Sequence, residues 1–164
     1  MIRFADSMYK IKGMWYAKLH ATKELLQFEK DVVALIAHDL LDDATAFMDE
    51  DDKARVQAFQ KDYELGVEKS AAKFQAIYDK LISDVGTDPR LFAQAVNGSK
   101  FDSMTMNVLF SLKKGIEARA KVREIIAKAA HPTAGTQRRV DDVRHLFGGI
   151  FWQDYRPTVV ETDE

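Results

Sequence analysis

The sequence predicts a mainly α-helical protein, with a short N-terminal β-hairpin followed by an all-α domain of five to seven helices. Residues 2–4 and 8–12 alternate polar and apolar side chains with the period of a β-strand. From residue 14 onward, apolar residues recur every three or four positions, as on one face of a helix. Capping residues and glycines separate these helical stretches. We therefore divide the chain into a hairpin (1–13), a helical domain (14–150) and an irregular acidic tail (151–164).

The predicted hairpin consists of two short strands, over residues 2–4 and 8–12, joined by a turn at 5–7. On the second strand, Lys10 and Lys12 point to the same side, about 7 Å apart by the rise of a strand. Two ammonium groups at this spacing suit a polyanion such as a nucleotide phosphate, although lysines on an exposed edge strand also prevent aggregation. Because an isolated hairpin is marginally stable, we expect this one to complete a larger sheet.

Three helical stretches are expected in the first half of the helical domain. The first covers about 14–26, and the second covers 29–48 with a break around 42–43. The acidic run 49–52 is expected to cap a long helix, because carboxylates favour the positive end of the helix dipole. This helix is expected to end at Gly86. Its apolar stripe consists of Val56, Phe59, Tyr63, Val67, Phe74, Ile77, Leu81 and Val85.

Four shorter helices are expected in the second half. The first covers 89–96 and opens on a capping aspartate followed by a proline, which is a typical helix start. Helices over about 102–114 and 116–130 follow, and the last amphipathic stretch covers 139–147. The side chains expected in the core of this half are Phe92, Phe101, Phe110 and Leu112.

Composition excludes several kinds of function. The chain of 164 residues contains no cysteine, which excludes disulfides, thiolate catalysis and cysteine-based zinc sites. No apolar run approaches the roughly 18 residues of a membrane span, so we expect no membrane partner. The net charge of -2 gives no overall attraction to nucleic acid, so any such binding must come from local patches. No metal site is expected, because the histidines are scattered singly: His20, His38, His131 and His145.

Basic residues of the second half are the candidates for an RNA-facing surface. Arg119 and Arg123 lie one helical turn apart, so their side chains share a face and can grip successive phosphates. Glu117 and Glu124 are close enough to neutralise part of this charge, so a solvated, salt-bridged face is the competing interpretation. The candidate set is Lys113, Lys114, Arg119, Arg123, Arg138 and Arg139, with Lys121 and Arg144 as further basic residues nearby.

The opening residues resemble a segment of the T4 RNA ligase 1-like enzymes, which are ATP-dependent covalent nucleotidyltransferases. The resemblance covers residues 3–12, the Trp-Tyr pair at 15–16 and the Leu-His pair at 19–20. Lys10 and Lys12 match the two lysines of the family's Lys-x-Lys motif. The resemblance therefore implies that these lysines contact the phosphates of ATP and stabilise charge during adenylyl transfer.

The resemblance further implies that the chain is the C-terminal portion of an RNA ligase. Residues 92–132 are similar in kind to the family's helical C-terminal domain, which helps select an RNA substrate, a broken tRNA anticodon loop in the best-known member. The chain contains no Lys-x-Asp-Gly nucleophile motif and lacks the metal-binding glutamate of the preceding strand motif. ATP and Mg²⁺ are thus implied for the complete enzyme, and we expect neither to bind this portion tightly.

The same resemblance implies a separate N-terminal nucleotidyltransferase half as a partner, and no ligation by this chain alone. The expected location is the cytoplasm of a bacterial or phage-infected cell. Two other interpretations stay open: a freestanding helical module that binds RNA or protein without catalysis, and a structural helical protein whose first twenty residues match by chance. For Trp15, a role in packing the sheet onto the first helix is preferred over stacking on a base.

Overall fold

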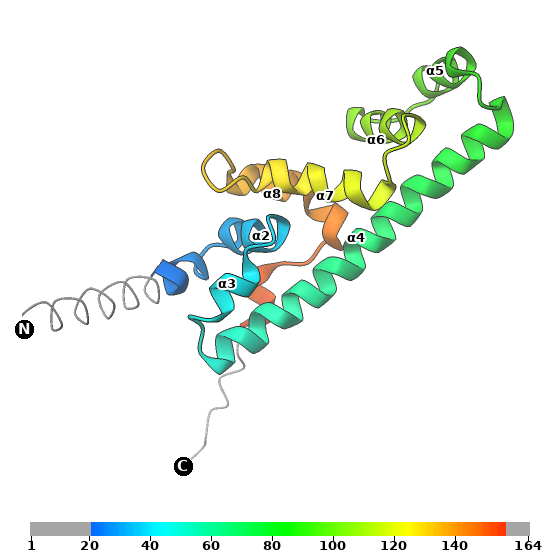
Figure 1. Ribbon diagram of the computed structural model, residues 1–164. Helices are drawn as coiled ribbons and strands as arrows, with labels where there is room; N and C mark the ends of the chain where they lie inside the picture. The colour runs from blue at the N-terminus through cyan, green and yellow to red at the C-terminus, as the bar shows by residue number, and fades with distance from the viewer. Residues whose placement is uncertain (1–20, 157–164) are drawn as a thin grey trace, which may run out of the picture.

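A long helix, α4 (Glu50–Val85), is the axis along which the other helices of the computed structural model are arranged (Figure 1). The structure describes residues 21–156, and within this range every regular element is helical, which confirms a mainly α-helical protein. The predicted hairpin over 1–13, with Lys10 and Lys12, lies outside the described residues.

The start and end of α4 follow from local sequence. The Asp49 side chain caps the helix by accepting a hydrogen bond of 2.8 Å from the backbone N–H of Asp52. Gly86 ends it in the left-handed region, at φ 77°, where a Cβ atom would be strained. Both predicted ends are therefore confirmed. The residues that α4 buries are Val56, Phe59, Tyr63, Gly66, Val67, Ala71 and Phe74.

Two helices, α2 (Glu29–Ala37) and α3 (Leu41–Thr45), precede α4, and residues 21–25 are also helical. The break between α2 and α3 does not lie at 42–43, where the sequence predicted it. Asp39 adopts the left-handed backbone conformation at φ 56° and ends α2 earlier. The two aspartates at 42–43 instead occupy the first turn of α3, where their carboxylates meet the positive end of the helix dipole.

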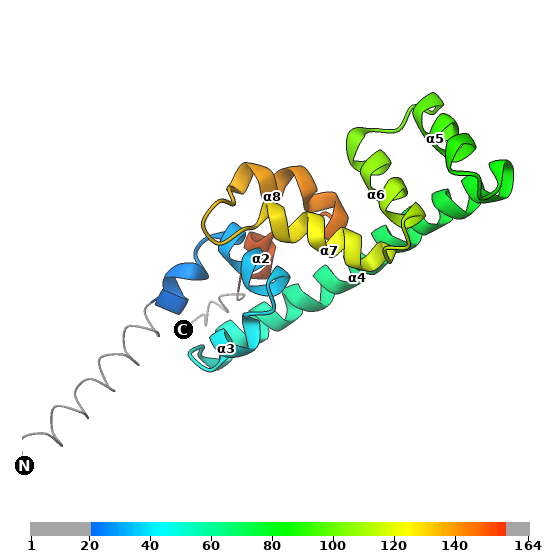
Figure 2. The same ribbon diagram turned by 45° about the horizontal axis from the view of Figure 1, so that its top comes forward.

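Four helices and two short 3₁₀ turns follow α4. They are α5 (Pro89–Gly98), α6 (Ser103–Lys113), α7 (Ala118–Ala129), α8 (Gln137–Val143), η1 (Arg144–Phe147) and η2 (Trp152–Tyr155). Figure 2 shows α5 and α6 over the C-terminal end of α4, whereas α2, α7 and α8 gather over its N-terminal part. Asp88 and Asp102 cap α5 and α6, as their positions in the sequence predict.

Two apolar clusters hold these elements together. The larger one joins α2, α4, α7, α8 and both 3₁₀ turns, with the rings of Tyr63 and Phe147 stacked at 5.3 Å. The smaller one lies between α4, α5 and α6 around Phe92. Of the predicted core residues, Phe92 and Leu112 are buried, while Phe101 and Phe110 are partly buried against the smaller cluster.

The folded domain extends beyond residue 150, where the sequence placed the start of an irregular tail. Trp152 is only 3% exposed, and its indole Nε1–H donates a 2.8 Å hydrogen bond to the carbonyl of Leu26. Tyr155 packs edge-on against the ring of Phe59 at 5.2 Å and donates a hydrogen bond to Asp62. The turn η2 is therefore part of the core. No helix within 21–156 is both long and apolar enough to cross a bilayer.

Candidate nucleic-acid interface

The six basic residues predicted to face RNA do not form one surface. Lys113 ends α6, where its ammonium group donates a 2.6 Å hydrogen bond to the carbonyl of Thr87. Lys114, the next residue, is exposed. Arg138 and Arg139 are exposed in the first turn of α8, which lies at the other end of α7 from α6 (Figure 1). The two lysines and these two arginines are thus separated by the length of α7.

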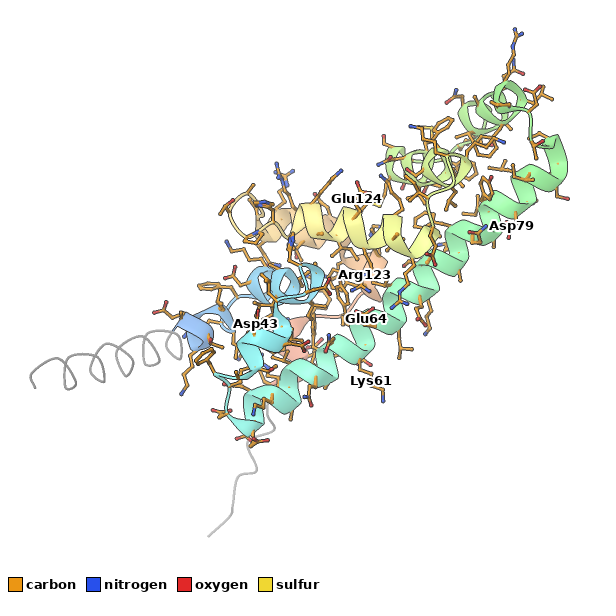
Figure 3. All side chains as sticks on the ribbon, in the orientation of Figure 1. Asp43, Lys61, Glu64, Asp79, Arg123 and Glu124 are labelled. Carbon is orange, nitrogen blue, oxygen red and sulfur yellow. The ribbon has the colours of Figure 1, made fainter. Side chains whose placement is uncertain are left out.

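Arg119 and Arg123 share a face of α7, as predicted, but this face points toward α4. Their guanidinium groups both pair with Glu64, at 3.3 Å and 3.5 Å, and Figure 3 shows Glu64 and Arg123 meeting between the two helices. Further ion pairs join Arg119 to Glu68 at 3.7 Å and Arg123 to Asp39 at 3.6 Å. The two arginines therefore help to fasten α7 to α4.

The carboxylates that neutralise this face differ from those expected. Glu124 pairs with Lys121 at 3.5 Å and Lys128 at 2.8 Å, all on α7, rather than with the arginines. Glu64, the partner of both arginines, comes from α4, more than fifty residues earlier in the chain. Local spacing cannot reveal a partner that only the packing of two helices supplies.

A different basic surface forms where α2, α8 and η2 meet the first part of α4. These elements enclose an open cleft of about 510 Å³. We call it the aromatic–arginine cleft, and its main side chains are Phe28, Lys30, Arg55, Phe151, Trp152 and Arg156. No pattern in the sequence marks these residues as a site. The three aromatic residues at 151–155 are the signal that could have indicated it, but they fall in the predicted tail.

The carboxylate of Glu29 ties together the elements around the cleft. It accepts a hydrogen bond from the Arg144 guanidinium, one of 2.7 Å from the backbone N–H of Trp152 and one of 2.9 Å from the Gln137 amide. Burial raises the pKa of Glu29, but these three hydrogen bonds outweigh that effect and hold the pKa below its ordinary value. Glu29 is therefore ionised at neutral pH and joins α2, α8 and both 3₁₀ turns.

Arg144 is the buried cation of this cluster. Besides Glu29, its guanidinium contacts Asp141 and donates a 2.7 Å hydrogen bond to the carbonyl of Ile150. Its guanidinium carbon also lies 4.0 Å from the ring centroid of Phe151. With only 10% of its side chain exposed and two carboxylates beside it, Arg144 serves the fold rather than an external anion.

Arg55 has a different environment. Its guanidinium lies 3.7 Å from the ring centroid of Trp152 and donates a 3.2 Å hydrogen bond to the carbonyl of the same residue. Burial lowers the pKa of Arg55, the Asp52 carboxylate partly offsets this, and the charge of Arg156 lowers it further. Among residues 21–156, no carboxylate lies within ion-pair distance of Arg55. Within the described residues, Arg55 thus carries at the cleft a positive charge that no direct ion pair neutralises.

Metal ligation has no candidate group in the described part of the chain, where no three His, Asp or Glu side chains come together. His38 Nε2 lies 3.0 Å from the carbonyl of Ala127. His131 Nδ1 accepts hydrogen bonds from the backbone N–H groups of Thr133 and Ala134, at 3.2 Å and 3.1 Å. Both rings therefore have local structural roles.

Glu29→Gln is expected to reduce the acid sensitivity of the domain. Because the folded-state pKa of Glu29 lies below its ordinary value of 4.5, its contribution to stability is present above that pH and is lost as the pH falls through the folded-state pKa. Urea denaturation at pH 7 and pH 3.5 measures this effect. The wild type should lose more stability between these conditions than the variant, since the carboxylates common to both cancel in the comparison. Equal losses would contradict this assignment.

No protein-family model, no curated protein and no solved structure matches this chain. Its function therefore has to be inferred from its residues and their geometry.

Proposed function

We propose that this chain is a C-terminal portion of an ATP-dependent RNA ligase, inactive alone. It would supply phosphate-contacting lysines and a helical domain for RNA recognition to a nucleotidyltransferase half on another polypeptide. The observation that carries the proposal is the order of its parts. A Lys-x-Lys stretch with the family's Trp-Tyr and Leu-His pairs stands directly before an all-helical domain. The alternative interpretations must attribute this order to chance.

The proposed chemistry divides between the two polypeptides. A lysine of the N-terminal half attacks the α-phosphate of ATP, pyrophosphate leaves, and the AMP passes to the 5′-phosphate of an RNA end. The 3′-hydroxyl of the other end then displaces AMP and forms the phosphodiester bond. Lys10 and Lys12 of this chain would balance negative charge on the phosphates during adenylyl transfer, because fixed cations stabilise charge that develops in a transition state.

Reconstitution tests the proposal. The chain is mixed with the product of an upstream reading frame that carries Lys-x-Asp-Gly and ends in Glu-Gly, together with radiolabelled ATP, Mg²⁺ and nicked RNA. We expect sealed RNA only from the mixture. Replacing both Lys10 and Lys12 by alanine should lower the sealing rate about a hundredfold, the scale of losing a charge-stabilising group.

The matched control replaces Lys61 and Lys80 by alanine, since both are exposed lysines of α4 and the Lys61 side chain points away from the other helices (Figure 3). This variant should seal RNA at the wild-type rate. A mixture that seals no RNA, or an equal loss in the two double variants, would contradict the ligase proposal.

A second candidate function is a freestanding RNA-binding module without catalysis. It is favoured by the aromatic–arginine cleft, which brings basic side chains and exposed aromatic rings together among the described residues. The two functions differ in one measurable outcome. The module predicts salt-sensitive RNA binding by this chain together with no ligation in any mixture, whereas the ligase portion predicts both binding and reconstituted ligation.

A further inference from the structure

The described residues do not neutralise all the cations of the aromatic–arginine cleft. Two acidic residues, Glu29 and Asp141, line the cleft, and both form ion pairs with Arg144. Within the described part of the chain, Lys30, Arg55 and Arg156 form no ion pair. The cleft thus combines three positive charges that have no ion-pair partner among the described residues with a fixed floor made of Arg144 and two carboxylates, and its lining keeps a net positive charge. Such a surface attracts anions even though the whole chain carries a net negative charge.

Two aromatic rings stand exposed beside these charges. Phe28 is 56% exposed at the N-terminus of α2, and Phe151 is 43% exposed in front of η2. The guanidinium of Arg144 at 4.0 Å covers the ring of Phe151 and limits its movement. Exposed rings next to arginines are the usual combination of proteins that bind single-stranded nucleic acid, since each base can stack on a ring while a cation holds the adjoining phosphate.

We propose that the aromatic–arginine cleft binds single-stranded RNA, with unpaired bases on Phe28 and Phe151 and phosphates on Arg55 and Arg156. This inference rests on the proposed function for its choice of RNA as the ligand. The volume of about 510 Å³ lies within the range of small-ligand sites. A duplex does not fit this chemistry, because its bases are stacked inside the helix and cannot reach the rings.

The fixed position of the Arg55 guanidinium explains why a phosphate should prefer to bind there. The guanidinium lies over the Trp152 ring, with its carbon 3.7 Å from the ring centroid, and it donates a hydrogen bond to the carbonyl of the same residue, so little side-chain freedom is lost when a ligand binds. Arg156 supplies a second guanidinium close enough to lower the pKa of Arg55. Phosphates bound to the two guanidinium groups would offset their mutual repulsion, which a neutral ligand cannot do.

Fluorescence anisotropy with a fluorescein-labelled ten-nucleotide single-stranded RNA tests the site on the full chain. The double variant Arg55→Gln, Arg156→Gln should bind at least tenfold more weakly and should lower the salt slope of log K by about 1.4, the value for two lost phosphate contacts on a single strand. Its matched control is Lys69→Gln, Lys73→Gln. These lysines line a separate cavity of about 300 Å³ with His145, so this variant loses the same charge at another place. It should weaken binding no more than twofold.

The aromatic contribution is tested without removing charge. Phe28→Ala should weaken binding about fivefold or more, the scale of losing one stacked base. Leu91→Ala on α5 is the matched control, because Leu91 is similarly exposed, at 48%, and α5 lies over the opposite end of α4 from α2 (Figure 2). Both substitutions are at exposed positions, so both proteins should unfold at the wild-type urea concentration. The Leu91 variant should bind RNA normally.

Three results would overturn the proposal: no binding of the single strand at low salt, equal losses in the two double variants, or duplex RNA binding as tightly as the single strand. Displacement of the RNA by an equal concentration of polyglutamate would also overturn it, because the cleft would then suit acidic protein segments.

The ligase proposal is judged separately. Binding through the cleft without reconstituted sealing refutes only the ligase, whereas sealing that is unaffected by Arg55→Gln, Arg156→Gln refutes only the cleft.

Discussion

Gly66→Ala should prevent the domain from folding stably. Gly66 lies in the middle of α4, and a Cβ atom there would come within 2.2 Å of the carbonyl carbon of Phe147 and 2.3 Å of the backbone nitrogen of Gly148. Both obstacles are backbone atoms, so no rotamer change can relieve the clash. The end of η1 must move away from α4, which separates the stacked rings of Tyr63 and Phe147. We expect a loss of about 3 kcal/mol or more in the free energy of unfolding.

The control for this substitution is Gly98→Ala, at the end of α5. A Cβ atom at Gly98 would have no neighbouring atom within 4 Å. Alanine has the higher helix propensity, so this variant should be unchanged or more stable by up to about 1 kcal/mol. Urea denaturation followed by circular dichroism at 222 nm compares the three proteins. If the free energy of unfolding of Gly66→Ala lies within 1 kcal/mol of the wild-type value, η1 does not approach α4 as closely as described here.

Arg144→Leu should destabilise the domain by about 2–4 kcal/mol. The substitution removes the cation between Glu29 and Asp141, and it leaves the Glu29 carboxylate, only 12% exposed, without a charged partner. Breaking a fully buried ion pair costs about 3–5 kcal/mol, and the residual exposure of these side chains lowers our expectation slightly. The substitution should also loosen the cleft. Arg144 donates a hydrogen bond to the carbonyl of Ile150, and its guanidinium lies over the ring of Phe151.

Arg138→Leu is the matched control, because Arg138 is an exposed arginine of the adjacent helix α8. It should change the free energy of unfolding by less than about 0.5 kcal/mol. Tryptophan fluorescence in a Trp15→Phe background adds a local measurement, since Trp152, the other tryptophan of the chain, is buried beside this cluster. We expect its emission to shift to longer wavelength in Arg144→Leu at urea concentrations where the far-ultraviolet signal is still native. Equal stability of the two variants would show that Arg144 does not organise the cluster.

Helix ends could be read from the sequence because they depend on neighbouring residues. Asp49, Asp88 and Asp102 each accept a hydrogen bond from a backbone N–H two or three residues ahead, and Gly86 adopts a conformation that other residues avoid. The buried stripe of α4 likewise follows from its apolar period. The break at Asp39 escaped prediction because a left-handed aspartate leaves no comparable pattern in the sequence.

Contacts between segments that lie far apart in the chain could not be predicted in this way. Arg119 and Arg123 looked like a phosphate-binding face, but α4 brings Glu64 against both of them. Trp152 looked like part of a tail, yet the backbone of Leu26 accepts its indole hydrogen bond. Each of these contacts joins residues far apart in the chain, so its existence depends on how the helices pack.

The sequence by itself therefore determined that this chain is helical, where most helices begin and end, and which face of α4 is buried. Those properties come from hydrogen bonds and apolar spacing within a few residues. Only the tertiary structure decided which charges remain available to a ligand. Ion pairs across helices occupy Arg119, Arg123 and Arg144, whereas Arg55 and Arg156 stay unpaired within the described residues beside two exposed rings. Coulombic attraction depends on distance in space, which residue order alone does not specify.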